Sequence, residues 1–219
     1  MRSYGQFCAM ARALDVVGDR WTLLILRELW LRPARFGNLA DALAGVASNL
    51  LTDRLKSLES AGVVARSSGP TPVYSLTERG RALIPVMQEL IRWGESEMAR
   101  GAGDDVYRNE WFALALAELI PAESVTARLL FELDFIDGGR PAVLVGEPGL
   151  GIRVVDGPVE TSSHPRIVGD PGVMIDALTG GGDLARVEIE GTAQQSKVLR
   201  ALLARVVRAR AAASTDGAV

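Results

Sequence analysis

Residues 48–62 read SNLLTDRLKSLESAG, and this stretch decides the fold of the first part of the chain. Leu51, Leu55 and Leu58 recur at i, i+4 and i+7, the spacing that places side chains on one face of an α-helix. Gly62 follows as a helix stop. Such a helix packs by its leucines and presents polar groups outward, a design suited to reading base edges in a DNA major groove. The polar face carries Asn49, Thr52, Asp53 and Lys56.

The composition is that of an ordinary soluble globular protein, with 48% hydrophobic and 23% charged residues among 219. The most apolar segment, residues 21–31, is too short for a membrane span and contains Arg27 and Glu28. The N-terminus lacks the basic-then-apolar pattern of a secretory signal. We therefore expect a cytoplasmic protein with no membrane partner.

Charge is divided unevenly along the chain. Residues 1–100 hold 13 Arg or Lys against 10 Asp or Glu, whereas the remainder holds 11 against 17. A mildly basic first half and an acidic second half suggest different partners for the two.

The chain has one cysteine, Cys8, and one histidine, His164. An internal disulfide and the usual Cys/His zinc site are therefore excluded, and a Cys/His nucleophilic pair would have to form between the two halves. We expect no metal, no cofactor and no enzymatic activity.

Helical spacing extends to both sides of the opening stretch. Residues 8–17 form one predicted helix, and residues 21–30 form a second that is capped by Asp19. A short helix over residues 36–43 and a glycine-containing turn lead into residues 48–62, which together make a helix-turn-helix.

The pattern changes after Gly62. Residues 63–66 and 73–76 are short β-prone runs joined by a turn-rich loop, which predicts a hairpin. Thr77 then caps a helix that bends at Pro85. Helices, a hairpin and a further helix in this order predict a winged helix-turn-helix.

These motifs resemble the HxlR family of bacterial winged-helix transcription regulators, relatives of the MarR group, over nearly all of residues 4–95. The resemblance implies operator DNA binding as a homodimer, with the outer helices in the dimer contact. Ala9 departs from the family where a proline often follows the cysteine, and Ala47 departs where a serine often caps the recognition helix. The matching motifs are Phe7-Cys8, residues 13–21 ending in Gly-Asp-Arg-Trp, Arg35-Phe36, Leu51-Thr-Asp-Arg-Leu55, Leu58-Glu59 with Gly62-Val-Val, and Tyr74-Ser-Leu-Thr-Glu-Arg-Gly80.

Carried onto this sequence, the base-edge candidates are Ser48, Asn49, Thr52 and Lys56. Asparagine can pair with adenine bidentately, and lysine reaches guanine or phosphate. Asp53 would repel phosphate, which keeps its part of the helix away from the DNA backbone.

Arg35 and Arg66 are phosphate candidates, although either could be an ordinary solvated arginine. Arg54 lies on the flank of the leucine face. It could contact phosphate or hold the helix through an intramolecular ion pair.

Cys8 has two interpretations as well. Some members of this family sense oxidants or electrophiles through an N-terminal cysteine, whereas most free cysteines are buried and inert.

The second half predicts an α+β domain, with antiparallel strands and with helices on one face. We expect a winged-helix domain over residues 1–100, a linker over 101–107 and the second domain over 108–219. Helices are expected at 110–120, 170–178 and 193–213, and strands at 127–135, 142–145, 152–155, 166–168 and 186–190.

The late motifs of this half resemble the sterol-carrier-protein-like lipid-binding fold, on residues 167–171, 178–180 and 187–191. That resemblance implies an apolar tunnel between sheet and helices. Plain core packing is the alternative for every residue of such a face. The residues expected to line the tunnel are Trp111, Phe131, Leu133, Met174 and Leu178.

The sequence as a whole predicts a dimeric regulator, a repressor, that binds palindromic double-stranded DNA through two winged helices. A small hydrophobic ligand in the second domain is expected to control it by shifting the spacing of these winged helices. One alternative is a redox-switched repressor that uses Cys8. The other is a lipid carrier whose winged helix only dimerises.

Overall fold

The computed structural model describes residues 3–98, 105–156, 164–179 and 182–216. The chain divides into two compact units, Met1–Glu89 and Leu90–Val219, which we call the N-terminal and C-terminal units. The division falls within helix α6 (Ile84–Met98), ahead of the expected linker. Residues 101–104 of that linker lie outside the described residues.

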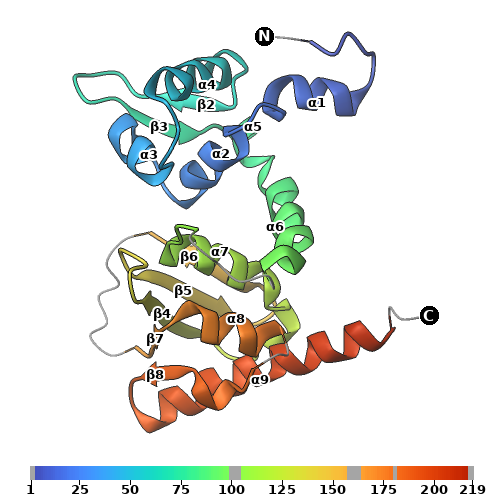
Figure 1. Ribbon diagram of the computed structural model, residues 1–219, viewed down its shortest axis with the longest axis vertical. Helices are drawn as coiled ribbons and strands as arrows, with labels where there is room; N and C mark the ends of the chain where they lie inside the picture. Colours follow the sequence, from blue (N-terminus) through green and yellow to red (C-terminus); the bar gives the residue numbers. More distant parts are fainter. Residues whose placement is uncertain (1–2, 99–104, 157–163, 180–181, 217–219) are drawn as a thin grey trace. The chain divides into compact units, whose positions relative to one another are not determined.

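The N-terminal unit is a winged helix-turn-helix, as predicted. Its strands form a small antiparallel sheet in the order β1-β3-β2, and the β2–β3 hairpin is the wing (Figure 1). The predictions missed the two-residue strand β1, which pairs with β3. The elements are α1 (Ala9–Val17), α2 (Thr22–Leu31), β1 (Ala34–Arg35), α3 (Phe36–Ala42), α4 (Ser48–Ser60), β2 (Val64–Arg66), β3 (Val73–Leu76), α5 (Glu78–Arg81) and α6.

The leucine face of α4 is the centre of this unit. Leu51, Leu55 and Leu58 are almost wholly buried and pack in one core with Ile25 and Leu26 of α2. Burying a leucine side chain stabilises a fold by roughly 1.5–3 kcal/mol, so this face fixes the rotation of α4 about its axis. Its polar side chains must then face outward.

The start of α2 differs from the prediction. The N-cap is Trp21, which has a left-handed backbone (φ 79°) and makes no side-chain cap. Asp19 does not cap this helix with its side chain; its carboxylate pairs instead with Arg54 of α4. Local spacing could not reveal this, because the partner lies in another element.

Thr77 joins three elements at the base of the wing. Its hydroxyl donates to the Gly62 carbonyl oxygen at 2.7 Å and lies 3.0 Å from that of Val63, and its oxygen accepts from the Gly80 N–H at 3.0 Å. The predicted cap is therefore confirmed. Gly80 lies so close to the wing that an added Cβ would come 2.2 Å from the Val63 oxygen.

The C-terminal unit contains a five-stranded sheet in the order β6-β5-β4-β7-β8. The expected all-antiparallel sheet is wrong in one pairing, because β7 lies parallel to β4. Strand β5 occupies one edge of β4, so β7 pairs with the other edge. There β7 runs in the same direction as β4. The elements are α7 (Asn109–Leu119), β4 (Leu129–Phe135), β5 (Ala142–Glu147), β6 (Gly151–Val155), β7 (Arg166–Gly169), α8 (Pro171–Thr179), β8 (Glu188–Glu190) and α9 (Ala193–Asp216), with short 3₁₀ turns at Ala122–Ser124 and Leu184–Arg186.

One face of this sheet packs in the core with residues of α7, α8 and α9. Phe131, Leu133 and Phe135 of β4 point into that core, as their alternation predicts. In α9 the buried stripe begins at Leu199, whereas the predicted Val198 is exposed.

The opposite face of the sheet carries a charged network. Glu132 accepts from His164 Nε2 at 2.9 Å and pairs with Arg166 at 3.2 Å. Arg166 also pairs with Asp134 and, at 3.5 Å, with Glu190. This network pairs the charges of the central strands on the side away from the core, although Arg166 Nε makes no hydrogen bond within the described residues.

Replacing Gly80 with Ala tests the junction at Thr77. We expect Gly80→Ala to destabilise the N-terminal unit by about 1–3 kcal/mol, because the new Cβ collides with the Val63 carbonyl and the backbone must shift. Gly94→Ala is the matched control, since its Cβ meets nothing within 4 Å and alanine is the better helix former. Urea unfolding followed by tryptophan fluorescence measures both. Equal midpoints for the two variants would contradict the proposed contact.

Candidate nucleic-acid interface

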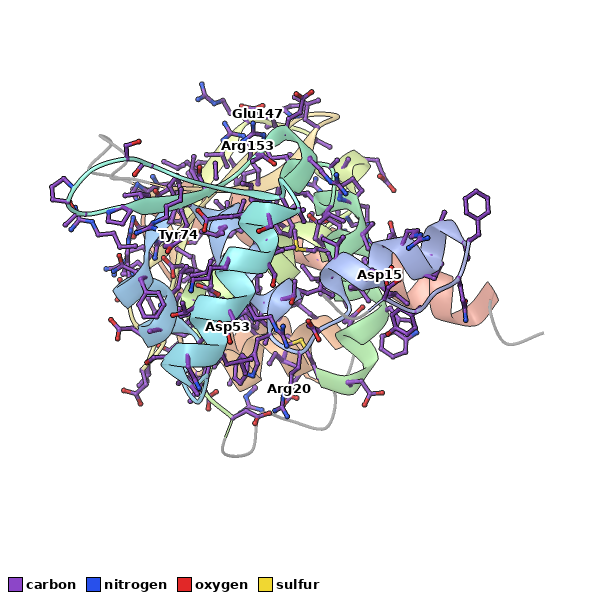
Figure 2. The ribbon with its side chains drawn as sticks, turned by 90° about the horizontal axis from the view of Figure 1, so that it is seen from above. Asp15, Arg20, Asp53, Tyr74, Glu147 and Arg153 are labelled. Carbon is purple, nitrogen blue, oxygen red and sulfur yellow. The ribbon has the colours of Figure 1, made fainter. Side chains whose placement is uncertain are left out.

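Helix α4 exposes the side chains expected to read DNA. Ser48, Asn49 and Lys56 are exposed, and Thr52 is half-buried. Figure 2 looks onto this helix, with Asp53 labelled on α4 and Tyr74 on β3 of the wing. The helix starts at Ser48 without a side-chain cap from Ala47. Within the first turn, the Leu50 N–H is nevertheless bonded by the Asn49 side chain.

Two of the base-edge candidates hydrogen-bond within the helix. The Thr52 hydroxyl donates to the Ser48 carbonyl at 2.8 Å, and Asn49 Oδ1 accepts from the Leu50 N–H at 2.8 Å. Asn49 must therefore release that bond before its amide can pair bidentately with a base. The Thr52 oxygen remains an acceptor while its proton is engaged.

Arg54 forms the intramolecular ion pair that was one of its two interpretations. Its Nη1 lies 2.7 Å from Asp19 Oδ2, and the side chains are 23% and 57% exposed. A pair this exposed contributes at most about 1 kcal/mol. Arg54 thus ties α4 to the α1–α2 loop, and Asp19 and Arg54 form a contact that sequence spacing alone did not find.

The wing presents Arg66 next to an aromatic side chain. Arg66 and Tyr74 are cross-strand partners, and the guanidinium carbon lies 5.9 Å from the Tyr74 ring centroid. Arg35 is exposed at the start of α3 and pairs in register with Val73. Both arginines belong to the same small sheet, but their partners are consecutive residues of β3, so the two side chains start from opposite faces.

Cys8 is exposed at the N-cap position of α1. The nearby backbone N–H groups of Ala11 and then Met10, at the start of α1, lower the pKa of the thiol below the ordinary cysteine value. A thiol at the start of a helix is more reactive for this reason.

The residues expected to line a tunnel lie in the core of the C-terminal unit, with one exception. Phe131, Leu133, Met174 and Leu178 are buried together. Trp111 is half-buried under the guanidinium of Arg108 and does not belong to that core. The aromatic residue that α7 contributes to the core is Phe112, whose ring centroid lies 5.0 Å from that of Phe135 in an edge contact. Phe112 was not among the residues predicted from the sequence.

Two cavities lined by described residues border this core, and both are small. One of about 20 Å³ touches Phe112 and Leu178, and one of about 80 Å³ touches Phe135 and Met174. Pockets for organic ligands usually measure about 300–1,000 Å³. A fatty ligand would fit neither cavity as it stands.

Within the described residues, no helix is long and apolar enough to cross a membrane. The same residues contain no cluster of three or more His, Cys, Asp or Glu side chains able to hold a metal ion.

Comparison with known proteins places the N-terminal unit. The family described as HxlR-like helix-turn-helix matches residues 16–102. An uncharacterized HTH-type transcriptional regulator of Synechocystis is 37% identical over 94 residues, 41% of this chain and 70% of the relative. The HTH-type transcriptional regulator YodB of Bacillus subtilis is 38% identical over 90 residues, 39% of this chain and 80% of YodB. The solved structure of quinone-bound YodB has 34% identity over 40% of this chain and 96% of that one, with a TM-score of 0.37.

The fold defines the N-terminal unit as a winged helix-turn-helix of the kind found in transcription regulators. The sequence comparison is more specific. The chain belongs to the HxlR family of helix-turn-helix transcriptional regulators.

Proposed function

We propose that this regulator acts in the cytoplasm as a homodimer on palindromic operator DNA, with α4 in the major groove. The observation that carries the proposal is the orientation of α4. Its leucine face is buried in the core, which leaves Ser48, Asn49 and Lys56 exposed on the other side. A recognition helix needs this division between a packing face and a reading face.

Phosphate contacts would position that helix. The start of α4 has no side-chain cap from Ala47 and offers the backbone N–H groups of Ser48 and Asn49, which favour an anion at a helix N-terminus. Arg66 on the wing and Arg35 at the start of α3 are exposed cations that can add to them. Arg54 is assigned a positioning role in this proposal, because Asp19 holds its guanidinium.

Substitutions on α4 test the reading face. Asn49→Ala should weaken binding to the operator by about tenfold or more and relax base preference at one position, because a bidentate base contact is worth about 1–3 kcal/mol. Lys56→Ala should weaken binding and reduce its salt dependence. The operator is first selected from random DNA with the intact protein, and affinities are then measured by fluorescence anisotropy at several salt concentrations.

Asp53→Asn is the matched control on the same helix. It removes an exposed negative charge near the DNA, so we expect equal or tighter binding, most visibly at low salt. Failure to select any preferred sequence would contradict operator binding. Unchanged affinity in both Asn49→Ala and Lys56→Ala would contradict the role of α4.

Exposed apolar side chains support the homodimer. Val86, Leu90 and Trp93 recur at i, i+4 and i+7 on α6, and Trp93 is 77% exposed. On α1, Phe7 just before the helix and Met10 within it are also exposed. Apolar side chains gathered in this way mark interaction surfaces, and the two outer helices are the expected dimer contact.

Trp93→Asp should weaken the dimer by at least about tenfold, since it places a charge where an aromatic would be buried. Sedimentation velocity over a dilution series measures the effect. Leu150→Asp is the control, because Leu150 is equally exposed (78%) but lies in the turn before β6. A monomeric wild-type chain, or equal effects of the two substitutions, would contradict the proposed surface.

A thiol switch is the second candidate for control of this regulator. Cys8 is exposed, and the start of α1 lowers the pKa of its thiol. The related YodB, as its solved structure records, binds a quinone. Electrophilic or oxidative modification of Cys8 would add a group at the end of α1 and alter the proposed dimer contact.

The pH dependence of alkylation tests this candidate. Iodoacetamide reports Cys8 alone, because the chain has a single cysteine. The rate should rise with pH through a midpoint below that of the same protein in urea, because the folded pKa is depressed and the thiolate forms at lower pH. Oxidant should release operator DNA from the wild type and leave the Cys8→Ser complex intact. Identical midpoints, or release of Cys8→Ser as well, would rule out the switch.

The identity of the C-terminal unit as a sterol-carrier-like domain is part of our proposal. One sheet face packed with helices supports this identity. The small cavities, in contrast, favour plain core packing in this conformation. A hydrophobic ligand at Phe131, Leu133, Met174 and Leu178 therefore requires the core to open. Release of DNA by such a ligand without oxidant would distinguish this control from the thiol switch.

A further inference from the structure

The N-terminal unit has a groove of about 240 Å³ between α1 and the chain around β2 and α5. Its apolar lining includes Val16, which is half-buried, Val63, which is buried, and Leu83, which is half-buried. Ala82 lies at the exposed rim. The groove is separate from the reading face of α4.

The charged side chains that line this groove, among the described residues, are Arg12 of α1 and Arg79 of α5. Arg12 forms an exposed ion pair with Asp15 at 3.5 Å and donates to Ser3 at 3.3 Å, and Asp15 also accepts from Ser3 and from the Tyr4 N–H. Arg79 is exposed and has no acidic partner within the described part of the chain. Two arginines, one of them held only by a long ion pair, therefore border an apolar groove whose lining includes no acidic side chain among the described residues.

A larger groove of about 530 Å³ on the other side of α1 lacks this imbalance. Its charged side chains are held more closely by their neighbours, Arg54 by Asp19 at 2.7 Å and Asp15 by Ser3 and the Tyr4 N–H at 2.9 and 2.8 Å, in addition to its longer pair with Arg12. A charged ligand would have to break those contacts before it could bind. The smaller groove is the better site for an anion.

We propose that the groove between Arg12 and Arg79 binds a small amphiphilic monocarboxylate. The carboxylate pairs with the two guanidinium groups, whose planar donors match its geometry. The hydrocarbon tail lies on Val16, Val63 and Leu83, where each buried methylene adds to affinity. This site is distinct from the reading face, from Cys8 and from the core of the C-terminal unit.

Occupancy would attach α1 more firmly to its unit. In α1 Ala11 is the one fully buried residue, and Val16 and Val17 pack half-buried against the core at the end of the helix, so its first turns have few contacts to hold them. A ligand that joins Arg12 of α1 to Arg79 of α5 adds one contact on each side. The proposed dimer surface on α1 would then be held in a fixed position.

Hexanoate is the probe, titrated into the full chain without DNA and followed by calorimetry. We expect it to bind at least about tenfold more tightly than hexanamide, its neutral counterpart. Arg12→Gln and Arg79→Gln should each weaken binding about tenfold, whereas the control Arg128→Gln, an exposed arginine of the C-terminal unit, should leave it unchanged. Ala82→Leu, which fills the rim, should also weaken it. Bound hexanoate should slow hydrogen exchange of the α1 amides.

Several outcomes would overturn the site. Equal binding of hexanamide would remove the role of charge, and equal binding of inorganic phosphate would remove the role of the tail. Unchanged affinity in Arg12→Gln and Arg79→Gln would place the ligand elsewhere, and absence of binding to the intact protein would show that the groove is not available. Because no DNA is present, loss of operator binding would not affect any of these results.

Discussion

The hydroxyl of Thr77 is the contact on which the DNA-binding half depends. It donates to the carbonyl that ends the α4 segment at Gly62, lies next to that of Val63 at the base of the wing, and accepts from Gly80 in α5. Three elements meet at this oxygen, and only glycine at position 80 allows α5 to approach the wing so closely. The position of the wing relative to α4 follows from this junction and from the leucine core beneath it.

Two of the motifs that carry the family resemblance have structural roles here. In Leu76-Thr-Glu-Arg-Gly80, the leucine fills the core while the threonine and glycine make the junction. In Gly18-Asp-Arg-Trp21, an added Cβ on Gly18 would come 2.6 Å from the Leu14 oxygen, and Asp19 holds Arg54. Both motifs help to position α4, and the side chains that we propose to read DNA lie between them in the sequence.

In the C-terminal unit, apolar and charged side chains lie on opposite faces of the sheet. The helix-covered face is a packed apolar core, and the other face carries the ion pairs of Arg166 with Glu132 and Asp134. Paired charges on a central strand are stable there because each has its partner in an adjacent strand or in the same one.

Periodicity along the sequence determined the existence of α4, the wing and the inward face of β4, because a helix or strand repeats its buried side every few residues whatever its neighbour is. The tertiary structure decided what lies opposite each face. In the tertiary structure β7 is parallel to β4, and Phe112 rather than Trp111 lies in the core. Asp19 forms an ion pair with Arg54 instead of capping the start of α2. These contacts depend on pairings between residues far apart in the chain. The periodicity within one helix or strand does not indicate which element packs against it.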